Sequence, residues 1–233
     1  MSNIISNTDI ISNKTSYIMK VLNKIDLKIE EIEKKITEIN HIYIQYEFNK
    51  NLKLEQPLSY LKFQVDFLYN EKKYFFNIKK YFTKKFVDEL YGISDFIILI
   101  LISLEDLDIG YTEEKKNIMN KIIKVVNQKV INSSKITELV NSINYNLKLS
   151  YDSIKLFEKF ILTSHNQNRK KNIHSKNLKI NLMNRKNHIE LETKKYSEQL
   201  EILINYFYEF STSIEMQLDK QKLLHFFINN KNI

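Results

Sequence analysis

The chain of 233 residues contains no Cys, no Trp and no Ala, and it has only two Gly and one Pro. Without Cys there is no disulfide scaffold, no zinc–thiolate or iron–sulfur site and no thiol nucleophile. Two Gly and one Pro cannot supply the turns of a many-stranded sheet or the loops of a nucleotide-binding α/β fold, because these repeatedly need residues with φ > 0. The sequence therefore predicts an all-α protein, an elongated antiparallel helical bundle or coiled coil with long helices.

Basic residues outnumber acidic ones, with 36 Lys and Arg against 28 Asp and Glu and a formal net charge of +8. The chain also has 35 Ile and 27 Asn, a bias typical of coding sequences rich in A and T. The spacing of Lys, Asn and Ile is therefore more informative than their number. Hydrophobic residues make up 43% of the chain, which is enough to build a core. The length predicts a single domain.

The first residues carry no pattern of a targeting signal. Met1–Asn13 has neither the basic start nor the apolar run of a signal peptide, and we expect it to be a flexible N-terminus of a cytoplasmic protein. The most apolar stretch, Phe96–Leu104, is shorter than the roughly 20 residues that a membrane-spanning helix needs. We expect this stretch to be a buried helix segment.

A heptad repeat predicts the first long helix. From Ile18 to Tyr46, apolar residues recur at alternating steps of four and three, and charged residues of both signs stand between them. Isoleucine at both seam positions disfavours a parallel dimer and favours a larger or intramolecular bundle. The helix should end near Gln56, because Pro57 disfavours a helical conformation at the preceding residue. The seam residues that we expect to pack are Ile25, Ile29, Ile32, Ile36 and Ile39.

A second helical pattern, from Leu58 to about Tyr91, is rich in aromatic residues and Lys. This combination is typical of a surface that stacks the bases of single-stranded nucleic acid and contacts its phosphates. The competing interpretation, which we favour, is that most of the aromatics belong to the core, because they share an apolar stripe. The aromatics expected in the core are Phe67, Phe75, Phe82 and Phe86, whereas Tyr60, Tyr74 and Tyr81 lie off the stripe and are candidates to face a ligand.

Two further heptad runs, 136–161 and 189–228, predict helices that pair as an antiparallel hairpin. Between them the apolar pattern lapses, and no acidic residue occurs from Lys159 to Ile189. We expect residues 164–188 to form a mobile basic loop that docks on an anionic partner, either nucleic acid phosphates or acidic lipid headgroups. Its candidate binding residues are Arg169, Lys170, Lys171, Lys176, Lys179, Arg185 and Lys186.

The sequence shows no arrangement typical of a catalytic or metal site. Glu38 and His41 form a Glu-x-x-His pair, but the heptad register places both toward solvent. There is no Gly-x-Ser-x-Gly motif and no glycine-rich phosphate loop. Adjacent carboxylates such as Glu30 and Glu31 point in different directions on a helix. We therefore expect no catalytic residues, no cofactor, no metal and no enzymatic activity.

The predicted layout is a flexible segment 1–13, a helical bundle over 14–163, a basic loop over 164–188 and a long C-terminal helix over 189–229. Three long helical units with a basic loop between the last two resemble the architecture of BAR domains, and this resemblance implies membrane contact through the loop. The function that we expect is a coiled-coil structural or interaction protein that forms homo-oligomers or binds helical protein partners. The alternatives are a membrane-surface protein, either BAR-like or inserting Phe96–Leu104 into lipid, and a nucleic-acid-binding protein.

Overall fold

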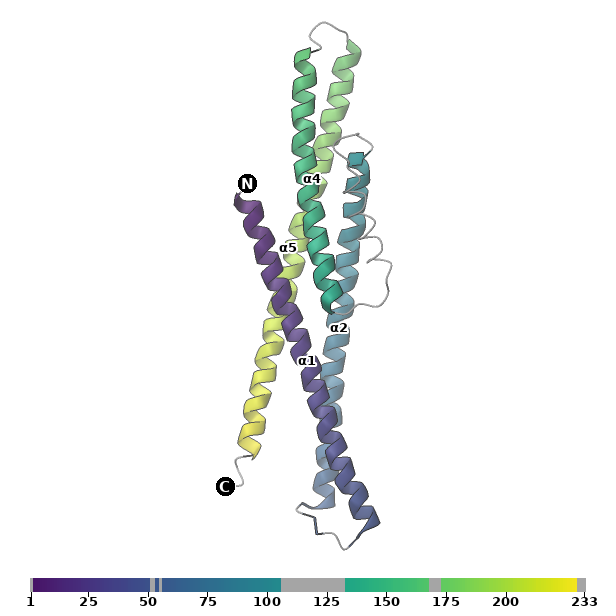
Figure 1. The fold of residues 1–233 in the computed structure, drawn as a ribbon, viewed down its shortest axis with the longest axis vertical. Helices are drawn as coiled ribbons and strands as arrows, with labels where there is room; N and C mark the ends of the chain where they lie inside the picture. Colours follow the sequence, from purple (N-terminus) through teal and green to yellow (C-terminus); the bar gives the residue numbers. More distant parts are fainter. Residues whose placement is uncertain (1, 51–52, 55, 106–132, 168–172, 230–233) are drawn as a thin grey trace. The chain divides into compact units, whose positions relative to one another are not determined.

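The computed structural model describes residues 2–50, 53–54, 56–105, 133–167 and 173–229, with side chains for 9–50, 53–54, 56–103, 136–159, 161–162 and 179–222. The described residues confirm the all-α fold, because they form four helices that pack on one another and contain no strand. None of these helices holds a stretch that is both long and apolar enough to span a membrane. The helices are α1 (Ser2–Phe48), α2 (Leu58–Glu105), α4 (Ser133–Gln167) and α5 (Ile173–Asn229) (Figure 1).

The turn between α1 and α2 contains the single Pro. Helix α1 ends at Phe48, earlier than the expected end near Gln56. Pro57 instead opens α2, because its carbonyl accepts hydrogen bonds from the backbone N–H groups of Tyr60 and Leu61, at 2.9 and 3.1 Å. A Pro at the start of a helix costs no backbone hydrogen bond, since the first N–H groups of a helix have no partner inside it.

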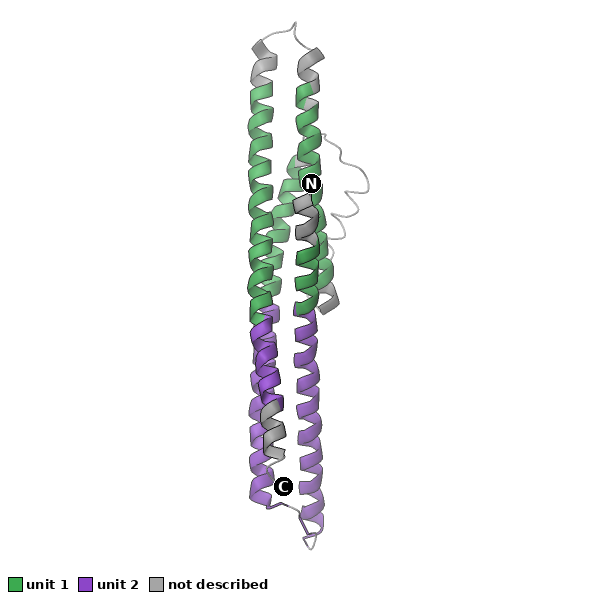
Figure 2. Ribbon diagram, turned by 90° about the vertical axis from the view of Figure 1, so that its left-hand side faces the viewer, with its two compact units in different colours: residues 1–17, 86–210 green, residues 18–85, 211–233 purple. Residues whose placement is uncertain are grey.

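The chain divides into two compact units, which share three of the helices. Unit 1 contains residues 1–17 and 86–210, and unit 2 contains residues 18–85 and 211–233 (Figure 2). Helices α1, α2 and α5 each contribute residues to both units, and α4 lies wholly in unit 1.

Unit 1 is held together by aromatic contacts between helices that are distant in the sequence. Phe86 of α2 packs on Phe207 of α5 with ring centroids 4.5 Å apart, and both rings are buried. One face of the predicted apolar segment is also buried, with Ile97 and Ile100 in the core. Its other face is not, because Leu99 is exposed. The expectation of a buried segment over Phe96–Leu104 therefore applies to one face only.

Unit 2 contains an antiparallel hairpin of α1 and α2. Its seam is largely as predicted, since Ile25, Ile32 and Ile36 are buried, but Ile29 and Ile39 are only half-buried. Ion pairs run between the two helices, and Lys28 and Glu71 form one in which both side chains are buried. Two further ion pairs between these helices join Glu33 to Lys72 and Asp26 to Lys79.

The aromatic residues of α2 are divided between core and surface. Phe75, Phe82 and Phe86 are fully buried, as predicted. The prediction for Phe67 was wrong, because its side chain is exposed. Phe67 precedes the buried Leu68, and neighbouring residues on a helix point about 100° apart.

The segment 164–188 is helical wherever the structure describes it, which corrects the prediction of a loop. Helix α4 runs on to Gln167, and α5 begins at Ile173. A lapse in apolar periodicity does not end a helix when neither Gly nor Pro is present, because Lys and Asn cost only tenths of a kcal/mol each, up to about 0.7. Residues 168–172 lie outside the described part of the chain.

The expectation of a flexible start is corrected in the same way. Residues 2–13 form the first turns of α1, and Ile11 is buried. The hydroxyl of Thr15, also buried, donates to the backbone oxygen of Ile11 at 2.7 Å. Ile11 stands seven residues before Ile18, so the buried seam of the first helix extends one heptad further toward the N-terminus than we expected.

Candidate functional site

Lys186, one of the predicted partner-binding residues, lies in the core of unit 1 and not on its surface. The residue is 8% exposed, and its Nζ lies 3.3 Å from carboxylate oxygens of both Glu158 on α4 and Glu190 on α5. Burial lowers the pKa of the Lys186 ammonium, but the hydrogen bonds and charges of these two carboxylates outweigh it and raise the pKa above its ordinary value. Lys186 therefore serves to join α4 and α5 and is not available to an anionic partner.

The other predicted binding residues do not form one exposed group in the part of the chain that the structure describes. Arg185 is exposed, and its Nη2 donates to the backbone oxygen of Ser103 at 3.4 Å. Lys179 is half-buried. Three residues, Arg169, Lys170 and Lys171, lie outside the described residues, as does the side chain of Lys176.

The pairing of α4 with α5 predicts a loss of stability at alkaline pH. Burial raises the pKa of the Tyr151 hydroxyl on α4 above 10.0, with a further contribution from the charges of Glu198 and Glu190, and a hydrogen bond to Ser197 opposes the shift. A group whose pKa is higher in the folded state contributes stability below its unfolded pKa and loses it as the pH rises through the folded pKa. Tyr151 and Lys186 therefore both contribute less to the free energy of unfolding as the pH rises.

We therefore expect the free energy of unfolding, measured by urea titration, to fall as the pH rises above 10. The fall should be smaller in Tyr151→Phe, which has no proton to release. Tyr145→Phe, on the exposed side of α4, is the matched control and should follow the wild type. An identical pH profile for Tyr151→Phe and the wild type would contradict the prediction.

The residues considered for metal binding are on the surface. Glu38 and His41 are both exposed, as the heptad register predicted, and the His41 ring nitrogen Nε2 lies 3.0 Å from the amide nitrogen of Gln45. Across the described residues there is no group of three His, Asp or Glu arranged to hold a metal ion.

Helix α5 covers one side of the α1–α2 hairpin in unit 2. Lys24 of α1 forms an ion pair with Glu215 of α5, and the hydroxyl of Tyr74 on α2 donates to Oε1 of Gln217 at 2.8 Å. Leu218 of α5 is buried. The side of the hairpin that carries Lys24 and Tyr74 therefore faces α5.

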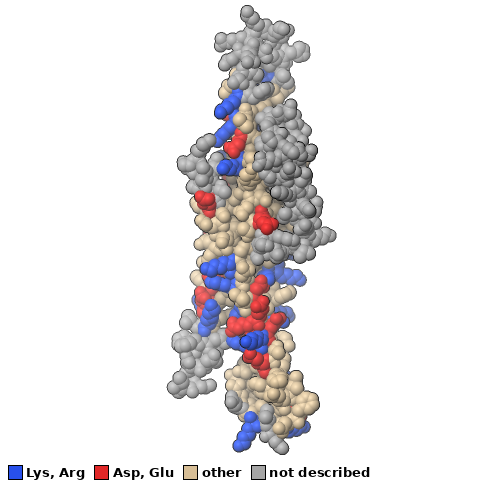
Figure 3. Space-filling view, viewed as in Figure 1, with Lys and Arg blue, Asp and Glu red and all other residues tan. Residues whose placement is uncertain are grey.

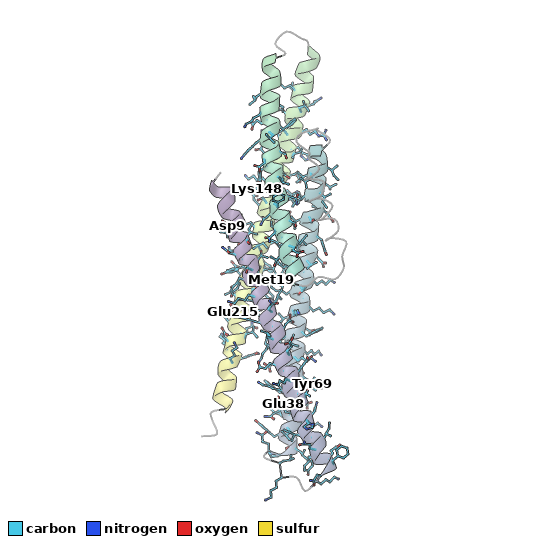
Figure 4. All side chains as sticks on the ribbon, viewed as in Figure 1. Asp9, Met19, Glu38, Tyr69, Lys148 and Glu215 are labelled. Atoms are coloured by element: carbon cyan, nitrogen blue, oxygen red, sulfur yellow. The ribbon has the colours of Figure 1, made fainter. Side chains whose placement is uncertain are left out.

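The same side continues along both helices toward their turn. A helix repeats its direction after about 18 residues, so Ile42 points the same way as Lys24. Phe67 and Phe63 precede Tyr74 by about two and three turns, so they lie on the same side of α2. Figure 4 labels Glu38 on α1 and Tyr69 on α2 in this part of the hairpin.

Large apolar and aromatic side chains line this continuation and are not covered. Phe63 is 65% exposed and Phe67 is 53% exposed. Single exposed apolar residues are common on proteins, but a contiguous group typically marks a site of interaction. We name this group the hairpin surface; it consists of Ile39, Ile42, Tyr43 and Tyr46 on α1 and Tyr60, Phe63 and Phe67 on α2, all exposed or half-buried.

The two helices of the hairpin carry opposite charge on their exposed sides. From residue 29 to 48, the exposed charged residues of α1 are mostly acidic, and from 58 to 85 those of α2 are mostly basic. Figure 3 shows a largely uncharged surface at the end of the hairpin, beside a band where acidic and basic side chains mix. The exposed residues are Glu30, Glu31, Glu33, Glu38, Glu47 and Lys34 on α1, and Lys62, Lys73, Lys80, Lys84 and Asp66 on α2.

Sequence reasoning found part of this site. Tyr60 was expected to face a ligand and is exposed, whereas Phe63 was not singled out and Phe67 was assigned to the core. The spacing of Phe63, Phe67 and Tyr74 at steps of four and seven is a second stripe on α2 that the sequence contains. No protein-family model, no curated protein sequence and no solved structure is significantly similar to this chain.

Proposed function

We propose that this chain is a non-enzymatic helical interaction protein, which associates with further copies of itself or with another helical chain through the hairpin surface. A single observation supports this function. The heptad seam is fully buried at Ile25, next to the ion pair of Lys24 with Glu215 of α5, and at Ile32, but it is only half-buried at Ile39, Tyr43 and Tyr46. A further helix in the position that α5 occupies at Lys24 would bury these residues.

The hairpin surface offers apolar area for association. Full burial of a large apolar side chain contributes about 1.5–3 kcal/mol. Phe63 and Phe67, which are more than half exposed, would each contribute more than half of that amount, and the half-buried residues of α1 would contribute less. These contributions oppose an association cost of about 4–15 kcal/mol.

A second candidate function is docking on an anionic partner, and the outer side of α2 favours it. On the side of α2 away from the hairpin surface, the exposed residues include Lys62, Lys73, Lys80, Tyr69 and Phe76, and Asp66 is the one exposed acidic residue between 58 and 85. Aromatic rings beside Lys suit single-stranded nucleic acid, and Lys also attracts acidic lipid headgroups. Since Lys186 is buried, this side of α2 is a better candidate for the role than the segment 164–188.

Sedimentation velocity of the purified chain tests the proposed function. We expect the wild type to sediment as an oligomer at concentrations of about 10–100 µM, and Phe63→Ser/Phe67→Ser to sediment as a monomer, because the variant removes the most exposed apolar area from the hairpin surface. Further samples contain a single-stranded oligonucleotide or anionic liposomes, and they measure the second candidate function directly.

Phe76→Ser is the matched control, because Phe76 is equally exposed on α2 but lies on a different side of the helix. It should leave the oligomer unchanged. A wild type that stays monomeric at about 100 µM would contradict self-association, and if it also bound the oligonucleotide or the liposomes, the second candidate function would replace the first.

A further inference from the structure

Helix α2 contains a short internal repeat within unit 2. Residues 69–75 read Tyr-Asn-Glu-Lys-Lys-Tyr-Phe, and residues 76–82 follow at once with Phe-Asn-Ile-Lys-Lys-Tyr-Phe. Five of the seven positions are identical, and the first position is aromatic in both copies. Seven residues make almost two turns of a helix, so equivalent positions lie on the same side of α2, about 10 Å apart.

Packing against α1 accounts for part of this repeat. The last residue of each copy, Phe75 or Phe82, is fully buried. The fourth residue of each copy, Lys72 or Lys79, forms an ion pair with a carboxylate of α1. The contact between two long helices favours a repeat of seven residues, because their facing positions recur at this interval.

The first and fifth positions of the repeat are not explained by this contact. Tyr69 and Phe76, at the first position, are 50% and 54% exposed. Lys73 and Lys80, at the fifth, are also exposed, and neither has an ion-pair partner among the described residues. Because these four residues follow one another at steps of four, three and four, they lie on one side of α2. This side therefore presents two rings, each with a Lys about one turn further along the helix.

The same side continues in both directions, and we name it the outer stripe. It consists of Lys62, Tyr69, Lys73, Phe76, Lys80 and Lys84, all exposed. Asp66 is the one exposed acidic residue between 58 and 85. Tyr74, which contacts α5, points about 100° away from Lys73 and about 160° away from Phe76. Helix α5 therefore lies against another side of α2 and leaves the outer stripe uncovered.

We propose that the outer stripe binds single-stranded nucleic acid, with bases stacked on Tyr69 and Phe76 and phosphates beside the four Lys. Aromatic rings receive the bases of a single strand whatever their sequence, and Lys neutralises its backbone. A strand repeats both groups along its length, as the two copies repeat a ring and a Lys along α2. The proposal rests on the second candidate function and adds to it the partner and the residues that bind it. It does not depend on association through the hairpin surface.

Single-stranded nucleic acid fits the outer stripe better than a lipid surface or a duplex does. A helix that lies in a membrane surface buries a broad apolar face. Here the exposed Asn70, Asn77 and Asp66 stand beside the two rings. In a duplex, each base is already stacked between its neighbours and offers no free face to a ring. The rings therefore favour a single strand over both alternatives.

The salt dependence of binding tests the role of the Lys. Fluorescence anisotropy measures the affinity of the full-length chain for a labelled oligonucleotide of about 20 thymidines. Each phosphate neutralised in a single strand contributes about 0.7 to the slope of log affinity against log salt, so Lys73→Gln/Lys80→Gln should lower the magnitude of this slope by about 1.4. Lys148→Gln/Lys155→Gln, on the exposed side of α4, removes the same charge at the same spacing and should leave the slope unchanged. A slope in Lys73→Gln/Lys80→Gln equal to that of the wild type would overturn the proposal.

Two single substitutions test the role of the rings. Tyr69→Ala and Phe76→Ala should each weaken binding of the oligonucleotide by about fivefold or more, because a base loses the ring on which it stacks. Neither should change the affinity for a duplex of the same length by more than about twofold. Tyr69→Phe keeps the ring and should bind like the wild type, and Tyr145→Ala, at an exposed ring of α4, is the matched control. No loss in the ring variants, or equal losses for single strand and duplex, would contradict the proposal.

The results separate this proposal from association through the hairpin surface. If the chain stays monomeric but the variants of the outer stripe lose affinity for the oligonucleotide, association fails and this proposal stands. If the chain associates but does not bind the oligonucleotide, this proposal alone fails. Binding to vesicles of phosphatidylserine and phosphatidylcholine, without binding to the oligonucleotide, also overturns it.

Discussion

Replacing Ile32 with Asn is expected to lower the free energy of unfolding by about 3–5 kcal/mol. Ile32 is fully buried in the seam between α1 and α2 of unit 2. The change removes the apolar contacts of a branched side chain and places a polar amide in the buried seam. A loss of this size is a large fraction of the stability of a typical domain.

Urea titration followed by circular dichroism measures this loss as a lower midpoint at an unchanged slope. Leu27→Asn is the matched control, because Leu27 lies on the same helix and is 64% exposed, and it should change the free energy by less than about 0.5 kcal/mol. Similar values for the two variants would mean that the seam of α1 is not a packed interface.

Replacing Phe86 with Ala is expected to destabilise unit 1 by about 3–5 kcal/mol. Phe86 is fully buried, and its ring packs on that of Phe207. The missing ring leaves a cavity between α2 and α5 that neither helix fills by a small movement. Hydrogen exchange by mass spectrometry, which resolves segments, should show the loss of protection in residues of unit 1.

Phe76→Ala is the control for this prediction, because Phe76 lies on α2 and is exposed. This variant should lower the free energy of unfolding by less than about 1 kcal/mol. A double-mutant cycle with Phe207→Ala should give a coupling energy of about 0.5–1.5 kcal/mol, as expected for two rings in contact. A coupling near zero would contradict the packing of Phe86 on Phe207.

Most of the buried seams were predictable from spacing alone. Ile25, Ile32 and Ile36 on α1, and Phe75 and Phe82 on α2, recur at the period of the helix and are buried. The prediction succeeds because the period of an α-helix places such residues on one face, whatever the rest of the chain does.

The segment 164–188 is a case in which the spacing of residues gave a wrong prediction. Its seven basic residues indicated a mobile binding loop, yet its described residues are helical and Lys186 is buried. The residue that pairs with Lys186 across the helices, Glu158, is 28 residues away. No local pattern reveals such a pair, because it forms only when α4 and α5 fold back on one another.

The candidate site was also only partly predictable. The sequence showed that α1 has a heptad seam and that α2 is rich in aromatics and Lys. It did not show that Phe67 lies outside the core, nor that Phe63, Phe67 and Ile42 share one side of the hairpin. That side is defined by the contacts of Lys24 and Tyr74 with α5, which join residues more than 140 positions apart.

The sequence by itself determined that the chain is all-α, which residues of each helix form its apolar stripes, and where the charge lies. These properties follow from composition and from the period of the helix, both of which are local. Only the tertiary structure decided which stripes are covered, which charged residues pair in the interior and which side of the hairpin is left exposed. These depend on how distant helices pack, because burial is a property of the neighbours of a residue and not of the residue alone.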